Sequence, residues 1–267
     1  MKNIVLSGVS GGMGLATAKL LTQEGYKVYG LDINEPSEVI ENLVFIKTDL
    51  RDQESVQNAY NTIISECVNI DAIVHMAGIY DLNSLVEIDE ARILRIFDIN
   101  FFSIYRLNKA FVNLLVDGGK IIITSSELAP LDPLPFTGLY GITKSTVEKY
   151  AFSLRMELQL LNKKVIIIRP GAVETKLLDA SARLIENFAD STKLYEYNAK
   201  YFLEITNKVE NRKIPPLKIA QLCSRILKTK RPKYIYKINR NPFLIMLNCL
   251  PQSLQTKIIR GILTSKR

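Results

Sequence analysis

The chain has 267 residues, of which 47% are hydrophobic and 23% are charged, and it carries a formal net charge of +8. This composition excludes a disordered chain, and the length is sufficient for one domain with a sizeable core. Three scattered cysteines, Cys67, Cys223 and Cys249, predict neither a disulfide framework nor a metal site. No apolar run approaches the roughly 20 residues that a membrane-spanning helix needs, and the short apolar stretch after Lys2 is not typical of a signal peptide. We therefore expect a globular, cytoplasmic protein without a bound metal.

Basic residues are concentrated toward the C-terminus. Fifteen of the 35 Lys and Arg residues lie from Asn207 onward, together with a single acidic residue, Glu210. The part before Asn207 therefore holds 20 basic and 26 acidic residues and is acidic overall. A basic segment that follows an acidic body requires its own explanation.

Short β-rich apolar runs alternate along the chain with segments of helical periodicity. We predict strands over Ile4–Leu6, Val28–Leu31, Leu43–Ile46, Ala72–Val74, Ile121–Thr124, Val165–Ile168 and Tyr234–Tyr236. We predict helices over Met13–Glu24, Asp52–Glu66, Asp89–Val116 and Tyr140–Leu161. This alternation predicts an α/β fold, a doubly wound parallel sheet of the Rossmann type with helices on both faces. We expect residues 1–240 to form one domain and residues 241–267 to form an extension.

The stretch SGVSGGMG, Ser7–Gly14, follows the first predicted strand and precedes the first predicted helix. One interpretation is a flexible turn. The other is a cradle in which backbone N–H groups approach a pyrophosphate at the N-terminus of the next helix. The spacing is Gly8-x-x-x-Gly12-x-Gly14, and Thr17 stands where the general dinucleotide fingerprint has its third glycine.

Asp32 follows the second predicted strand, 18 positions beyond Gly14. A carboxylate at about this distance accepts hydrogen bonds from an adenosine ribose and repels a 2′-phosphate. Because Ser7–Gly14 contains no Arg or Lys, the sequence favours NAD over NADP. The alternative is a solvated loop aspartate.

The next two predicted strands end in Thr48-Asp49-Leu50 and His75-Met76-Ala77-Gly78. Ligands of such sheets bind outside the carboxyl ends of the strands, and a small pair such as Ala77-Gly78 lets the backbone come close to one. His75 is the only histidine, but a lone histidine at a strand end is more often structural than catalytic.

The fifth predicted strand ends in Thr124-Ser125-Ser126, and YGITK follows fourteen residues after Ser126. Tyr140 and Lys144 lie at i and i+4, on one face of a helix. A lysine cation, helped by an oxidised nicotinamide ring, lowers the pKa of a tyrosine from its usual value near 10 and makes it a usable acid or base. Ser126 is then placed to hydrogen-bond the same substrate oxygen. Alone, Tyr-x-x-x-Lys also occurs in helices by chance.

Together, these motifs resemble the short-chain dehydrogenase/reductase family over residues 1 to about 240. The resemblance implies a catalytic tetrad of Asn100, Ser126, Tyr140 and Lys144. It implies contacts to the cofactor from Gly8, Ser10, Gly12, Met13, Gly14, Asp32, Asp49, Leu50, Ala77, Gly78, Tyr140, Lys144, Pro170, Val173 and Thr175. Two departures stand out. Met76 replaces the usual Asn of Asn-Ala-Gly, and the longer Ser-to-Tyr spacing leaves open whether Ser125 or Ser126 faces the substrate.

The resemblance implies an NAD(P)-dependent oxidoreductase that transfers a hydride between nicotinamide and a secondary alcohol or ketone. It also implies a small-molecule substrate, a homo-oligomer and no nucleic-acid partner. The apolar segment at about residues 176–215 favours a lid over an apolar substrate such as a steroid, lipid or acyl chain. That segment could equally be a dimer contact or local core. Two other classes stay open, a dinucleotide-sensing protein and a sugar-nucleotide epimerase or dehydratase.

The end of the chain, Asn241–Leu263, contains an apolar run broken by Pro251 and then a helical pattern. Leu254, Ile258 and Ile262 share a face of that helix, while Lys257 and Arg260 lie off it. Such a helix can rest in the interface of an anionic membrane, with charge added by the upstream cluster KTKRPKYIYKINR. It could equally pack on its own acidic body or on a second subunit.

Overall fold

A computed structural model describes residues 1–175, 187–209 and 213–265. The strands found there form one parallel sheet in the order β3-β2-β1-β4-β5-β6-β7. Their bounds are β1 Lys2–Ser7, β2 Tyr26–Asp32, β3 Leu43–Lys47, β4 Ile70–His75, β5 Leu115–Thr124, β6 Lys164–Pro170 and β7 Ile235–Ile238. The predicted doubly wound sheet is confirmed. The strand order reverses between β1 and β4, where such sheets bind their ligands.

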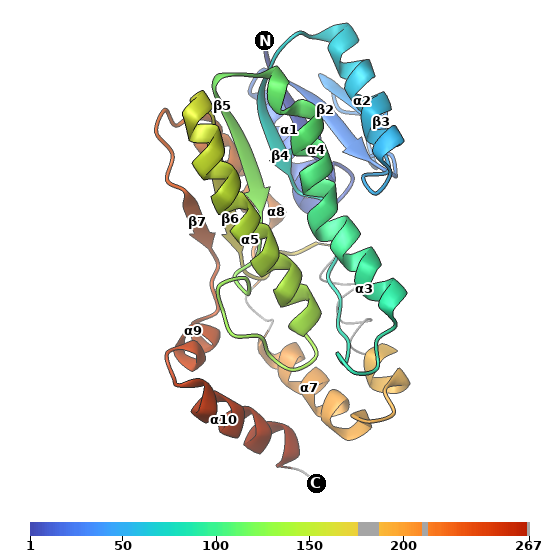
Figure 1. Ribbon diagram of the computed structural model, residues 1–267, viewed down its shortest axis with the longest axis vertical. Coiled ribbons are helices and arrows are strands. Elements are labelled where there is room, and N and C mark those ends of the chain that lie inside the picture. The colour runs from blue at the N-terminus through green and yellow to red at the C-terminus, as the bar shows by residue number, and fades with distance from the viewer. Residues whose placement is uncertain (176–186, 210–212, 266–267) are drawn as a thin grey trace.

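Helices cover both faces of the sheet, as the continuously apolar strands require. α2, α4 and α5 lie on one face, and α1 and α8 pack together on the other (Figure 1). The helices over the sheet are α1 Gly12–Gln23, α2 Gln53–Glu66, α3 Glu90–Phe97, α4 Ser103–Phe111, α5 Gly138–Leu158 and α8 Pro216–Lys228. α7 Glu196–Val209, α9 Pro242–Asn248 and α10 Gln252–Thr264 lie beyond the carboxyl ends of the strands (Figure 1).

The register of the central strands brings the predicted site residues together. Ser7, the last residue of β1, pairs with Leu31 of β2 and with His75 of β4. Because these strands are parallel and end level with one another, the loops after them meet at one edge of the sheet. Gly8, Asp32 and Ala77 therefore come from three different loops at the same edge.

The prediction of one helix over Asp89–Val116 is wrong at both its centre and its end. α3 and α4 are separated by a π-helical turn over Asp98–Phe102, and β5 already begins at Leu115. The buried Leu115 pairs with Ile70 of β4, so the sheet takes residues whose apolar pattern alone extended the helix. The strand then passes through an irregular register before its regular pairing resumes.

The C-terminal extension folds into α9 and α10. Asn241 caps α9, because its side chain accepts hydrogen bonds from the backbone N–H groups of Phe243 and Leu244. α10 packs against α7 and α9. Among the residues that the structure describes, no helix combines the length and the apolar character needed to span a bilayer.

The face of α10 that packs inward differs from the predicted stripe. Gln255 and Leu263 are buried and Ile259 is partly buried, whereas Leu254 and Ile262 are 42% and 45% exposed. The buried stripe is offset from the predicted stripe by one residue along the sequence, so the two stripes lie next to each other around the helix. The pattern of apolar residues could not tell which of them faces the protein, because both are mainly aliphatic.

Candidate active site

The glycine loop leaves no room for side chains. Gly8 has a φ of +73°, and a Cβ there would lie 2.6 Å from the backbone nitrogen of Ala77. A Cβ on Gly14 would lie 2.0 Å from the carbonyl oxygen of Gly8, and one on Gly12 would lie 2.8 Å from Cγ2 of Thr175. The glycines therefore fix a compact backbone turn directly before α1, which a merely flexible connection would not require.

The N-terminus of α1 has no side-chain cap. The N-cap residue is Gly11, which has no side chain to accept hydrogen bonds from the first N–H groups of the helix. The first turn has no acidic residue. The first N–H groups of a helix point outward and carry a partial positive charge. The glycine loop and this helix end together fit the pyrophosphate of a dinucleotide.

Asp32 lies next to the glycine loop at the end of β2. One of its carboxylate oxygens accepts a hydrogen bond from the backbone N–H of Ser10 at 3.1 Å, and the other accepts one from Asn34 N at 3.2 Å. The side chain is therefore oriented beside the turn, as a ribose contact requires.

Asp49 is held by its own neighbour. The guanidinium of Arg51 donates to its two carboxylate oxygens at 2.9 and 2.6 Å, and this interaction holds the pKa of Asp49 below its usual value. Leu50 is buried beside it. A contact between Asp49 and adenine would have to share the carboxylate with Arg51.

The departure at Met76 is accommodated by the backbone and by sulfur. Met76 N donates to the carbonyl oxygen of Ser7 at 3.2 Å, and Ala77 N donates to Ser7 Oγ at 3.4 Å. Thr17 Oγ1 donates to the carbonyl oxygen of Met13 at 2.8 Å and also lies 3.4 Å from the Met76 sulfur. Thr17, which stands where a third glycine was sought, thus ties α1 to the end of β4.

Ser126, and not Ser125, faces Tyr140. Ser125 Oγ donates to a carboxylate oxygen of Glu148 at 2.9 Å, and Glu148 is also bound by Arg169. Ser126 lowers the pKa of the Tyr140 hydroxyl, and both residues line the same cavity. The extra residue between the serine and the tyrosine is therefore absorbed by the loop before α5.

Burial dominates the electrostatics of Tyr140 and Lys144. The ammonium of Lys144 lies 5.7 Å from the centre of the Tyr140 ring and donates to the carbonyl oxygen of Thr124 at 3.2 Å. Desolvation raises the pKa of Tyr140 to about 12, against the smaller opposing effect of the Ser126 hydrogen bond. Desolvation also lowers the pKa of Lys144 to about 8. The protein alone thus raises the pKa of Tyr140, contrary to the effect expected from its lysine neighbour.

Asn100 is fully buried in the π-helical turn between α3 and α4. Its side chain accepts from Ile79 N at 2.8 Å and donates to the Ile79 carbonyl oxygen at 3.0 Å and to Thr143 Oγ1 at 3.2 Å. A Cβ on Gly78 would lie 3.3 Å from Asn100 Oδ1 and 3.5 Å from Lys144 Nζ. The side-chain amide therefore holds the segment after β4 against α5, next to the lysine.

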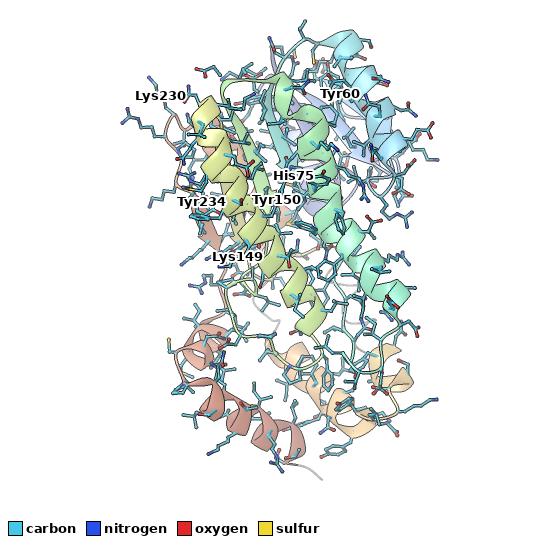
Figure 2. The ribbon with its side chains drawn as sticks, in the orientation of Figure 1. Tyr60, His75, Lys149, Tyr150, Lys230 and Tyr234 are labelled. Carbon is cyan, nitrogen blue, oxygen red and sulfur yellow. The ribbon has the colours of Figure 1, made fainter. Side chains whose placement is uncertain are left out.

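His75 is part of the interior. It lies behind α4 and α5, near Tyr150 (Figure 2). A ring nitrogen lies 2.9 Å from Asn108 Oδ1, and Asn108 donates to Tyr150 Oη at 3.2 Å. Complete burial lowers the pKa of His75 to about 4, so the ring is neutral at neutral pH. The structural interpretation of this histidine fits these contacts.

A cavity of about 650 Å³ lies at the carboxyl ends of the strands. Ser126, Tyr140 and Lys144 line it, and so do six residues with expected cofactor contacts, Met13, Ala77, Gly78, Pro170, Val173 and Thr175. The seven other residues with expected cofactor contacts do not line this cavity, namely Gly8, Ser10, Gly12, Gly14, Asp32, Asp49 and Leu50. The adenosine side of the expected site therefore lies outside it.

The opposite wall of the cavity was not predicted from the sequence. Tyr80 packs edge-on against Tyr140, with ring centres 4.7 Å apart. Leu244 and Leu247 of α9 and Leu263 of α10 also line the cavity. The sequence signal for this wall was the apolar character of the C-terminal segment, for which packing on the body of the protein was one of the alternatives left open.

Glu127 joins this wall to the sheet. It follows Ser126 directly, lines the cavity and is buried, and burial raises its pKa. Its carboxylate accepts a hydrogen bond from the backbone N–H of Asn241 at 2.6 Å. The start of α9 is thus held beside Ser126.

The lid segment expected at about residues 176–215 falls partly outside the described residues, at 176–186 and 210–212. Its described part includes α7, whose Phe202 packs with Leu82 and Leu263 in an apolar cluster and lines the cavity. Within the described ranges, no group of three or more His, Cys, Asp or Glu side chains is arranged to hold a metal ion.

Known proteins share both the sequence pattern and the fold. A family model for short chain dehydrogenases matches residues 2–184. A 3-ketodihydrosphingosine reductase of Bacteroides thetaiotaomicron is 29% identical over 237 residues, covering 88% of this chain and 87% of the relative. An NADPH-dependent 1-acyldihydroxyacetone phosphate reductase of Schizosaccharomyces pombe is 27% identical, covering 78% of this chain and 73% of the relative.

Among solved structures, a short chain dehydrogenase family protein from Francisella tularensis is 29% identical, with a TM-score of 0.74. The match covers 89% of this chain and 97% of the other. The family match spans more than half of the chain and includes the glycine loop, Ser126, Tyr140 and Lys144. The chain therefore belongs to the short-chain dehydrogenase/reductase family of oxidoreductases.

Proposed function

We propose that this protein transfers a hydride between a nicotinamide dinucleotide and a secondary alcohol or ketone with an apolar body. The observation that carries the proposal is that Ser126, Tyr140 and Lys144 line one largely apolar cavity, with the Lys144 ammonium 5.7 Å from the centre of the Tyr140 ring. A dinucleotide-sensing protein would have no need for this arrangement.

The residues present fit a dinucleotide. The glycine loop is closed to side chains, the N-terminus of α1 is uncapped, and Asp32 stands beside both. When bound, the nicotinamide supplies the hydride acceptor or donor. We propose NAD as the preferred form, because the carboxylate of Asp32 would repel a 2′-phosphate.

The chain's own residues would handle the proton. Tyr140 would donate its hydroxyl proton to the carbonyl oxygen in reduction and take it back in oxidation, while Ser126 holds the same oxygen. Lys144 would stabilise the tyrosinate, and a positive charge placed beside Tyr140 would offset the burial that raises its pKa. Asn100 would position this group by holding residues 78–79 against α5.

The substrate class follows from the cavity. Besides the catalytic residues, its lining includes Tyr80, which packs against Tyr140, and Phe202 and aliphatic side chains of α9 and α10. An apolar cavity of about 650 Å³ fits a steroid or an acyl chain better than a small polar ketone. The two relatives named above are reductases whose names specify lipid-type substrates. We therefore favour a lipid or acyl ketone.

We also propose a cytoplasmic homo-oligomer that touches membranes through residues 241–267. α4 and α5 lie side by side on the outer face (Figure 1). They carry exposed apolar side chains, among them Tyr105, Phe152 and Met156. Such a face fits a second copy of the chain, since isolated monomers rarely expose contiguous apolar patches. Light scattering of the purified protein tests the oligomeric state.

The function is tested by following the absorbance of NADH and NADPH with a panel of steroid, long-chain acyl and small water-soluble ketones. We expect NADH to be consumed fastest with a long-chain or steroid ketone. Consumption of neither nucleotide with any ketone or the matching alcohols would refute the proposed activity.

A further inference from the structure

α9 and α10 have apolar side chains on two sides. Leu244, Leu247 and Leu263 face the cavity and line it. Met246 of α9 and Leu254 of α10 do not line the cavity and are 65% and 42% exposed. The helix pair is therefore a thin wall with an apolar inner surface and an apolar outer surface.

Two side chains belong to both surfaces. Phe243 and Ile262 line the cavity, yet 65% and 45% of their surface is exposed. A residue that lines a cavity and remains this exposed lies at its rim. The cavity therefore reaches solvent beside the outer apolar surface of α9 and α10.

Charge identifies the occupant of this surface. From residue 240 to the end, the sequence contains five basic residues, Arg240, Lys257, Arg260, Lys266 and Arg267, and no Asp or Glu. The neighbouring Asp132 is already bound by Gln252 and Gln255 at 3.0 and 2.9 Å. Lys257 and Arg260 are exposed on α10 next to the outer apolar stripe. A basic helix with such a stripe matches the interface of an anionic bilayer.

The start of the upstream basic cluster lies far from α9 and α10. Lys230 lies at the amino-terminal side of β7, at the opposite end of the molecule from α9 and α10 (Figure 2). Of the basic residues that the structure describes from Arg240 onward, Lys257 and Arg260 are exposed on α10, whereas Arg240 lines the cavity. At about 1 kcal/mol for each cation near such a surface, this smaller set still attracts the helix pair.

A second copy of the chain fits this surface less well. Stable protein interfaces take about 20–30 residues from each side. α9 and α10 have 7 and 13 residues, part of which already face inward. A protein partner would also cover the rim that Phe243 and Ile262 keep accessible.

We infer that α9 and α10 rest on an anionic membrane, with Phe243, Met246, Leu254 and Ile262 in the boundary between headgroups and acyl chains. The rim of the cavity then opens to the bilayer, and an apolar substrate enters the active site from the membrane rather than from water. The entry of a lipid substrate rests on the proposed function, whereas the docking of the helices does not.

Sedimentation with vesicles tests the docking without any need for activity. The full-length protein is mixed at low salt with vesicles of phosphatidylcholine alone or with 30% phosphatidylglycerol, a composition chosen as roughly that of a moderately anionic bilayer. The test variant is M246Q/L254Q, which changes two exposed side chains outside the cavity. The matched control is V39Q/V68Q, which changes two side chains that are 102% and 81% exposed on the body of the protein. The charge variant is K257E/R260E.

We expect wild type and V39Q/V68Q to sediment with anionic vesicles and not with neutral ones. M246Q/L254Q should lose at least about tenfold in vesicle affinity while its melting temperature is unchanged, and K257E/R260E should stay in the supernatant. Wild type that ignores anionic vesicles, or M246Q/L254Q that binds them like wild type, would overturn the docking. So would a change in the oligomeric mass of M246Q/L254Q without a change in vesicle binding, because that result assigns the surface to a second copy.

An activity measurement then tests entry from the membrane. M246Q/L254Q should reduce a short water-soluble ketone at the wild-type rate but a long-chain ketone embedded in anionic vesicles at least about fivefold more slowly. Equal loss on both substrates would overturn entry from the bilayer. If no ketone is turned over at all, the proposed function fails, and the sedimentation result still decides the docking.

Discussion

The backbone at Gly8 and Gly14 comes so close to its neighbours that no side chain fits, whereas Phe243 and Met246 on the other side of the active site are each 65% exposed. The first region, the nucleotide side, consists of the glycine loop and the ends of β1, β2 and β4. The second, the substrate side, consists of α7, α9 and α10. Tyr140 lies between them and lines the cavity that they share.

The two regions differ in what determines their shape. On the nucleotide side, the Met76 N–H donates to the Ser7 carbonyl oxygen, the Ala77 N–H donates to the Ser7 hydroxyl, and close glycine contacts constrain the backbone. On the substrate side, the wall is held by side-chain packing around Phe202 and Leu263 and by the Glu127 bond to Asn241. Backbone geometry fits a fixed ligand, and packed side chains can suit substrates of different shapes. We therefore expect substitutions to affect the two sides separately.

The largest effect is expected where the two sides meet. Tyr140→Phe removes the hydroxyl that would carry the proton, and general acid–base catalysis contributes on the order of 10²–10⁴ in rate. We expect turnover to fall about 10³-fold, or ~4 kcal/mol, with little change in nucleotide affinity. Initial rates and nucleotide titration by fluorescence measure the two quantities. Turnover within tenfold of wild type would exclude Tyr140 from this role.

The free energy of unfolding should decrease in acid because of His75, the last residue of β4 on the nucleotide side. Burial lowers its pKa to about 4, against an ordinary value near 6.5, so the unfolded state binds a proton that the folded state does not. The stability from the neutral ring is complete above pH 6.5 and is lost as the pH falls toward 4. Down to pH 5 we expect a loss of about 2 kcal/mol in the free energy of unfolding.

His75→Gln keeps a neutral amide that can donate to Asn108 but does not titrate. Urea denaturation of both proteins at pH 7, 6 and 5 measures the difference. The variant should lose less stability than wild type over this range. If the free energies of unfolding of the two proteins fall in parallel between pH 7 and pH 5, His75 is not the group whose titration lowers the stability. No other histidine can take this role, because His75 is the only one in the sequence.

The shape of the glycine loop and the proximity of Tyr140 to Lys144 could be predicted from the sequence because these patterns are local. Tyr140 and Lys144 are four residues apart, and the glycine loop adjoins its strand and helix. The substrate side could not be predicted in the same way. The contact of Leu263 with Phe202 joins residues 61 positions apart in the sequence, and helical periodicity does not say which aliphatic stripe of α10 packs inward. The start of β5 at Leu115, where the apolar pattern predicted a continuing helix, likewise depends on pairing with the distant Ile70.

A substitution at Asp32 should change the choice of nucleotide without changing the choice of ketone. Asp32→Ala removes the negative charge beside the expected ribose site and frees the backbone N–H of Ser10. We expect the ratio of kcat/KM for NADH to that for NADPH to fall about twentyfold, or ~1.8 kcal/mol, because the repulsion of a 2′-phosphate disappears. The preference among ketones should not change. A wild-type protein that already uses NADPH better than NADH would contradict the assignment of Asp32.

Leu263 is the corresponding position on the substrate side, and its replacement is expected to have the smallest effect. This side chain is 8% exposed and packs against Phe202 of α7, so Leu263→Ser weakens the contact that holds α10 over the cavity. Because α10 is a peripheral helix, it should loosen without unfolding the sheet. We expect kcat/KM for a long-chain ketone to fall about fivefold, or ~1 kcal/mol, while the affinity for NAD and the rate with a short ketone stay at wild-type values. The matched control is Thr264→Ser, which changes the adjacent exposed residue and should leave all three quantities unchanged. If Leu263→Ser instead reduced the affinity for NAD as much as the long-chain rate, the two sides of the cavity would be coupled, and the distinction between backbone-built and side-chain-built walls would not hold.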